Sequence, residues 1–252
     1  MKVKEVGLEI NFVELKQKNL KGYTLIEGFP GLGLVGTIAA KYLVERLKLE
    51  EIGYIESNAF TPIIRIHKGQ PVRPVRIHIS EKHKLVVIIS EQIIPTITVN
   101  KLAKSLINWV EQKGIKKVIS IAGIKDSTQT NNNKIYGISC CSSDSDLLKE
   151  HKVQLIEDGI TTGVAAMILL ELKNNPNVDG YSLLGNAKLT ADYNAAAESL
   201  KKLDEIIGLN LDIIPLLKEA KETQGAIMKQ IEKMKKTHKS VEELNEGLPM
   251  YT

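Results

Sequence analysis

The stretch that decides the fold is Glu27-Gly28-Phe29-Pro30-Gly31-Leu32-Gly33-Leu34-Val35-Gly36. It follows an apolar run at residues 23–26 and precedes residues 37–48, whose apolar side chains recur at the spacing of a helix. Gly31, Gly33 and Gly36 match the pattern G-x-G-x-x-G in the strand, loop and helix setting that this pattern requires, and Glu56 lies about 20 residues further on. One hypothesis is therefore that the loop binds a nucleotide.

The other residues of the loop favour a different interpretation. Pro30 has no N–H to offer an anion, and Leu32, Leu34 and Val35 are apolar, which predicts a packed turn. No second catalytic domain and no matched His and Asp pair accompany the motif. We expect a packed strand-to-helix turn, and an α/β enzyme that binds a nucleotide or nucleoside at the loop from Gly31 to Gly36 is the alternative.

Working outward, buried strands alternate with amphipathic helices along residues 1–210. This order predicts an α/β core domain with a mostly parallel sheet flanked by helices. Strand 75–79 alternates and is expected to be half exposed, with His67 and His78 facing solvent. Helix 164–173 is apolar nearly all round, which predicts a central position. Helix 98–113 carries an apolar stripe and ends at Gly114.

Composition excludes several classes of protein. The 252 residues are 43% hydrophobic and carry a net charge of +4, too small an excess to indicate a nucleic-acid partner. Cys140 and Cys141 are adjacent, the histidines have no metal-ligand spacing, and no apolar run is long enough to span a membrane. We expect a cytoplasmic protein with no catalytic residues, cofactor or metal, and with neither membrane nor nucleic acid as a partner.

Residues 211–237 form a second unit, predicted as a C-terminal helix with a heptad seam. Apolar residues step by three and four on a charged helix, and a polar Gln224 lies among them. The seam predicts a partner helix from another copy of the chain, and hence a homo-oligomer, although packing on its own domain stays open. The seam consists of Leu217, Ala220, Gln224, Ile227, Ile231 and Met234.

Residues 238–252 lose all periodicity and are predicted to be a flexible tail. The tail ends in Met250-Tyr251-Thr252, where a tyrosine in an aromatic-poor chain stands beside the terminal carboxylate. One hypothesis is a docking peptide whose tyrosine supplies contact area and whose carboxylate meets a lysine. The other is a tail tucked onto the body.

Three further stretches, with residues 27–36, carry a resemblance to a known family: Ser90-Glu91-Gln92-Ile93-Ile94-Pro95, Ile121-Ala122-Gly123 and Asp158-Gly159-Ile160-Thr161-Thr162-Gly163. From about residue 20 to 235 the chain resembles archaeal homologues of the proteasome-assembling chaperones. The resemblance implies an α/β fold similar to nucleoside phosphorylases without their catalytic residues, no known reaction, and homo-oligomers. Some members carry a C-terminal hydrophobic–tyrosine–any-residue motif that docks between α-subunits of the proteasome core particle. Met250, Tyr251 and Thr252 match that motif.

Overall fold

The glycine-rich turn joins the central strand of a large sheet to the helix that covers it. A computed structural model describes residues 7–126 and 134–218. Strand β2 (Thr24–Gly28) ends at the turn, a short 3-10 segment η1 (Leu32–Leu34) follows, and α1 (Val35–Arg46) begins directly after it. Leu25 and Ile26 are fully buried because strands flank β2 on both sides and helices cover both of its faces.

The main sheet has nine strands in the order β1-β3-β6-β7-β2-β8-β11-β9-β10. Its centre, β7-β2-β8-β11, is parallel, and antiparallel pairs join it to the strands on either side. Hairpin β4–β5 forms a separate two-stranded sheet. The remaining strands are β1 (Ile10–Glu14), β3 (Glu50–Ser57), β4 (Arg65–His67), β5 (Gln70–Val72), β6 (Val75–Ser80), β7 (Leu85–Ser90), β8 (Lys117–Ile124), β9 (Ile135–Ser139), β10 (Gln154–Leu155) and β11 (Asp179–Asn186).

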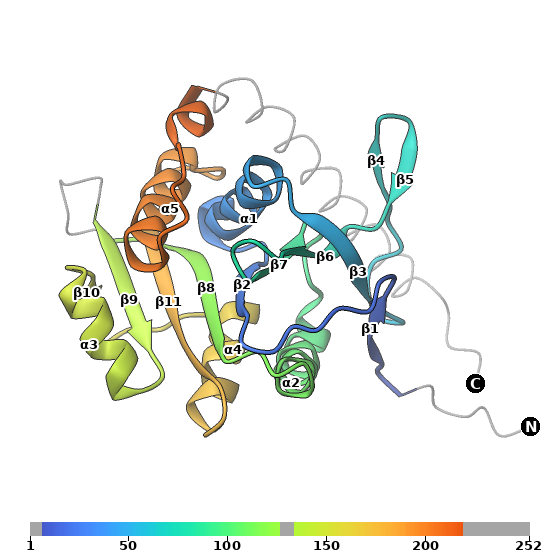
Figure 1. Cartoon of the computed structure of the whole chain (residues 1–252), viewed down its shortest axis with the longest axis horizontal. Helices are drawn as coiled ribbons and strands as arrows, with labels where there is room; N and C mark the ends of the chain where they lie inside the picture. The colour runs from blue at the N-terminus through green and yellow to red at the C-terminus, as the bar shows by residue number, and fades with distance from the viewer. Residues whose placement is uncertain (1–6, 127–133, 219–252) are drawn as a thin grey trace, which may run out of the picture.

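Helices cover both faces of this sheet and enclose two apolar cores (Figure 1). The first core lies under α1, α3 and α5, and the second lies under α2 and α4. The predicted α/β fold with a mostly parallel central sheet flanked by helices is confirmed. The other helices are α2 (Thr96–Gln112), α3 (Ser142–Glu150), α4 (Val164–Lys173) and α5 (Tyr193–Ile207).

Helix α2 follows its predicted pattern closely. Leu102, Leu106, Trp109 and Val110 are buried in the second core. The helix ends where Gly114 takes a left-handed conformation, and Ile115 donates its N–H back to the Val110 carbonyl at 3.1 Å. This bond between residues five positions apart is typical of a glycine-terminated helix.

Two burial predictions were wrong. Strand β6 is not half exposed, because its first five residues are buried on both faces of the sheet, and His78 is only 5% exposed. Helix α4 is not central, since it packs on α2 and β11 with Leu170 left 55% exposed. Periodicity reports which side chains are polar, but it cannot say how many layers of protein cover them.

The predicted heptad seam falls almost entirely outside the described residues. Leu217 is 42% exposed, whereas its neighbour Leu216 is buried against the first core. The seam positions Ala220, Gln224, Ile227, Ile231 and Met234, together with the tail, lie beyond residue 218. Within the part of the chain that the structure describes, no helix is both long and apolar enough to cross a membrane.

Candidate functional site

The glycines of the turn are needed because other backbone segments approach them closely. A Cβ on Gly36 would stand 2.2 Å from the Ile121 carbonyl oxygen, and one on Gly123 would stand 2.0 Å from that of Leu32. Gly33 has φ of +63° and faces the Ala187 Cβ, which leaves no room for a side chain. These contacts clamp the turn against β8 and β11. Packing within the protein therefore explains Gly33 and Gly36 without a bound phosphate, whereas a Cβ on Gly31 would meet open space.

The loop between β11 and α5 is fixed to the same turn by Asp192. Its backbone N–H donates to the Gly33 carbonyl at 2.8 Å. Its carboxylate accepts from the backbone N–H groups of Lys188 and Ala195 at 2.9 Å each, and it also accepts from Leu189 at 3.3 Å. A carboxylate of the protein therefore occupies the N-terminus of α5, a place where α/β proteins often hold an anion.

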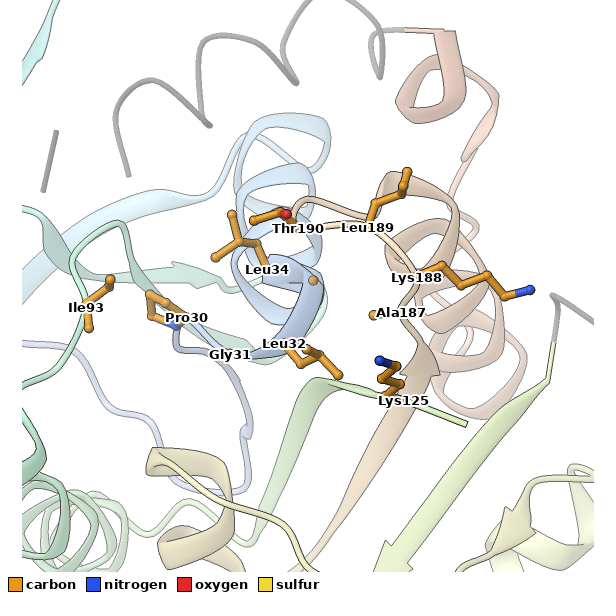
Figure 2. A pocket seen from close by; sticks show the side chains of 11 residues that line it. Pro30, Gly31, Leu32, Leu34, Ile93, Lys125, Ala187, Lys188, Leu189 and Thr190 are labelled. Carbon is orange, nitrogen blue, oxygen red and sulfur yellow. The ribbon is translucent and has the colours of Figure 1, made fainter. Parts of the chain in front are cut away.

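A pocket of about 430 Å³ opens where the parallel strands end (Figure 2). Strand β2 leads to α1 on one face of the sheet, whereas its neighbour β7 leads to α2 on the other, so their connections diverge at this point. Such divergence points are the usual ligand sites of α/β folds. The pocket is lined by Pro30, Gly31, Leu32, Gly33, Leu34, Ile93, Lys125, Ala187, Lys188, Leu189 and Thr190.

The walls of this pocket are mainly apolar. Leu32 and Leu189 are 49% and 53% exposed, and the prediction that Leu32 is packed inside the turn was wrong. Figure 2 shows the Lys188 side chain extending away from Leu32 and Leu34. The other lysine of the lining, Lys125, has its amine near Ala187 in Figure 2, so the pocket combines apolar walls with one positive charge.

The dinucleotide arrangement is not assembled around the turn. Glu56 lies on β3, and β6 and β7 separate that strand from β2. The Glu56 carboxylate instead meets the Arg73 guanidinium at 3.2 Å. A dinucleotide site needs this acid on the strand next to the glycine turn. The residues therefore match the motif in sequence but do not come together in the fold.

A carboxyl group that sequence analysis did not single out lies in the centre of the sheet. Glu27 is fully buried on β2, beside Ser120 of β8 in the strand register. One carboxyl oxygen accepts the Phe29 N–H at 3.0 Å. Burial raises the pKa of Glu27 to about 7, and the Ser120 hydroxyl and Phe29 N–H offset only part of that rise.

A buried ion cluster at the end of β7 was also missed. Glu91 receives Arg76 at 2.8 Å on one carboxyl oxygen and Arg65 at 3.2 Å on the other. Arg76 is 5% exposed, and Arg65 comes from β4, so the cluster ties the β4–β5 hairpin to the end of the sheet. The polar alternation of β6 was the available signal, but it was interpreted as solvent exposure.

His78 neighbours this cluster on β6. Burial first, and then the positive charge of Arg76, lower the pKa of His78 to about 3. The ring is therefore neutral near pH 7, and its 3.8 Å approach to the Glu51 carboxylate is not an ion pair. His67, by contrast, is exposed on β4 as predicted.

The remaining candidates give no catalytic arrangement. Burial, with Asp144 nearby, raises the pKa of Cys140 to about 12, so this thiol is a poor nucleophile. Among residues 7–126 and 134–218, no three His, Cys, Asp or Glu side chains are grouped as metal ligands. Met250, Tyr251 and Thr252 lie outside the described residues.

The fold and this edge of the sheet define a class of α/β proteins that have already been seen in crystals. Pyrococcus furiosus PbaA, an archaeal homologue of proteasome-assembly chaperone, superposes with a TM-score of 0.80 at 29% identity, covering 92% of this chain and 100% of that one. Pyrococcus furiosus PbaB, an archaeal proteasome activator, has a similar fold with a TM-score of 0.70 at 24% identity, covering 88% and 98%.

The chain belongs to the PAC2 family, whose profile matches residues 25–231. Among curated proteins, MJ0106 of Methanocaldococcus jannaschii, which is uncharacterized, is 28% identical and covers 96% of this chain and 98% of its own length. The family resemblance inferred from residues 27–36 is thus confirmed for the body of the chain.

Proposed function

We propose that this chain is a non-enzymatic, homo-oligomeric protein of the cytoplasm that binds the proteasome core particle as an assembly chaperone or activator. The observation that carries the proposal is the PAC2 family match together with the likeness to PbaA across its whole chain. The interior supports it, since the pKa of Cys140 is too high and the pKa of His78 too low for nucleophilic or general acid–base work near neutral pH. Glu27 has a pKa of about 7, but its side chain is fully buried and out of reach of a substrate.

The proposed contact is the C-terminal tripeptide. Tyr251 would pack with its hydroxyl hydrogen-bonded, Met250 would fill an apolar groove, and the Thr252 carboxylate would meet a lysine between two α-subunits. Roughly 14 residues separate Lys236 from Tyr251, and as a flexible chain they reach on the order of 20 Å.

Oligomerisation would strengthen this contact. A single short peptide binds weakly, but several tails on one oligomer raise the effective concentration of each, by about a hundredfold where the geometry fits. The predicted helix seam at Leu217, Ala220, Gln224, Ile227, Ile231 and Met234 is a proposed source of that assembly.

The motif itself is tested by two variants that differ at neighbouring positions. Tyr251→Ala should abolish measurable binding to an archaeal core particle, whereas Thr252→Ala should bind as the parent does, because the motif accepts any residue at its end while keeping the carboxylate. Equal binding by Tyr251→Ala and the parent in a surface-immobilised binding assay would remove the tail from the account.

The alternative hypothesis, an enzyme that binds a nucleotide at the loop from Gly31 to Gly36, has a pocket in its favour. The positions of Glu56 and Asp192 and the apolar walls weigh against it. We therefore keep the proteasome-binding function as the conclusion.

A further inference from the structure

The β4–β5 hairpin presents an apolar face to solvent. Burial alternates along residues 61–66, and the outward positions are Pro62, Ile64 and Ile66. Ile64 and Ile66 are 62% and 72% exposed, and Pro71, the cross-strand partner of Ile66, is exposed as well. Arg65 points inward to Glu91. The hairpin therefore turns a polar side chain inward and apolar side chains outward, which is the reverse of the pattern expected for a hairpin surrounded by water.

This hairpin is held in a fixed position. The Arg65–Glu91–Arg76 cluster anchors its base, and the turn at Lys68 and Gly69 has φ of +49° and +77°, the left-handed pair of a tight two-residue hairpin. A two-stranded ribbon alone is only marginally stable in water, so the buried ion pairs are needed to stabilise this hairpin. Lys68 places a positive charge at its tip, with no ion pair among the described residues.

A surface of opposite charge lies between β10 and α4. Glu157 and Asp158 are exposed there, and Ile160 is 96% exposed. The loop leads into α4, whose Leu170 is 55% exposed although the helix sequence is apolar nearly all round. A helix with this composition is normally covered on every side.

The two surfaces cannot meet within one chain. Figure 1 shows the hairpin and α4 on opposite sides of the molecule, with the sheet between them. β10 is the last strand on one side of the sheet, and the hairpin leads into β6 in the other half. Contact between them therefore requires a second copy.

We propose that copies of this chain join head to tail, with the β4–β5 hairpin of one copy packing on the 157–163 loop and α4 of the next. Ile64 and Ile66 cover Ile160 and the outer face of α4, and Lys68 lies beside Glu157 and Asp158. Two different surfaces in contact make a heterologous interface, which closes into a ring when the rotation between copies divides a full turn. The inference rests on the homo-oligomer of the proposed function and gives it an interface in the body of the chain.

Sedimentation of the full-length chain over a range of concentrations tests this interface. Lys68→Glu and Asp158→Lys should each raise the dissociation constant of the oligomer about tenfold or more, because each places like charges together. Combining the two restores an opposite pair, so the constant should return to within about threefold of the parent. Ile66→Asp should also dissociate the oligomer, whereas Leu15→Asp, at a 60% exposed position elsewhere, should not.

Three results would overturn the proposal: a parent chain that stays monomeric, a double variant weaker than both single ones, or an Ile66→Asp variant as oligomeric as Leu15→Asp. Deleting residues 250–252 separates this inference from the proposed function, because the deletion should leave the number of chains in the oligomer unchanged. If the double variant restores the oligomer but the chain does not bind the proteasome, the interface stands and the proposed function is rejected. If the chain binds the proteasome but the interface variants do not change its oligomeric mass, only the interface is rejected.

Discussion

Glu27 is a carboxyl group buried in the middle of a sheet with a pKa of about 7. The unfolded chain titrates this group near 4.5, so the folded state binds the proton more tightly. Stability from this group is complete below pH 4.5 and is lost as the pH rises through 7, by about 3 kcal/mol in all.

Replacing Glu27 with glutamine should remove this dependence, because the amide stays neutral and can still accept the Phe29 N–H. The free energy of unfolding of Glu27→Gln minus that of the parent should increase between about pH 5 and pH 7 and level off above. Urea titrations across this range provide the measurement, and titration of His78 cancels in the difference. A difference independent of pH would show that Glu27 ionises as freely as in water.

Substitutions at Gly36 and Gly31 distinguish a turn determined by packing from a loop that binds a ligand. Gly36→Ala should lower the free energy of unfolding by at least about 2 kcal/mol, since its Cβ meets the Ile121 carbonyl oxygen at 2.2 Å. Gly31→Ala has open space and should change it by less than about 0.5 kcal/mol. Chemical denaturation of both variants makes the comparison. Equal tolerance at the two positions would contradict the packing explanation.

At the scale of elements, the hairpin depends on one carboxylate. Glu91→Ala leaves the nearly buried Arg76 without its partner, which should cost about 3–5 kcal/mol. Hydrogen exchange of residues 65–72 should speed up at the same time, because Arg65 is also released.

Glu56→Ala is the matched control for this variant. It removes the exposed Arg73–Glu56 pair at 3.2 Å and should cost less than about 1 kcal/mol, with exchange in the hairpin unchanged. A similar cost for the two variants would mean that the buried cluster does not anchor the hairpin.

For the whole molecule, the sequence predicted the helices and strands better than it predicted how deeply each of them is buried. Alternating strands and helices and the apolar stripe of α2 were enough to predict the α/β fold, because periodicity reports local structure directly. The predicted burial of His78 and of α4 was wrong, since burial depends on which strands and helices become neighbours. The polar alternation of β6 marked Arg76, but a local pattern could not show that Arg76 and Arg65 would both pair with Glu91.

The candidate site shows the same division. Leu34 and Val35 are buried as predicted and Leu32 is not, while the close contacts of Gly36 and Gly123 show that packing determines the turn. The sequence offered the turn only as an alternative nucleotide site, because the apolar lining of the pocket comes from segments far apart along the chain. Tyr251 and its neighbours stay a prediction, because they lie outside the described residues.

The most direct test of the account is the affinity of the full-length chain for a proteasome core particle before and after deletion of residues 250–252. We predict that the deletion abolishes binding while the free energy of unfolding and the oligomeric mass of the chain stay the same. Undiminished binding by the shortened chain would contradict the central claim that this PAC2 protein docks through Met250, Tyr251 and Thr252.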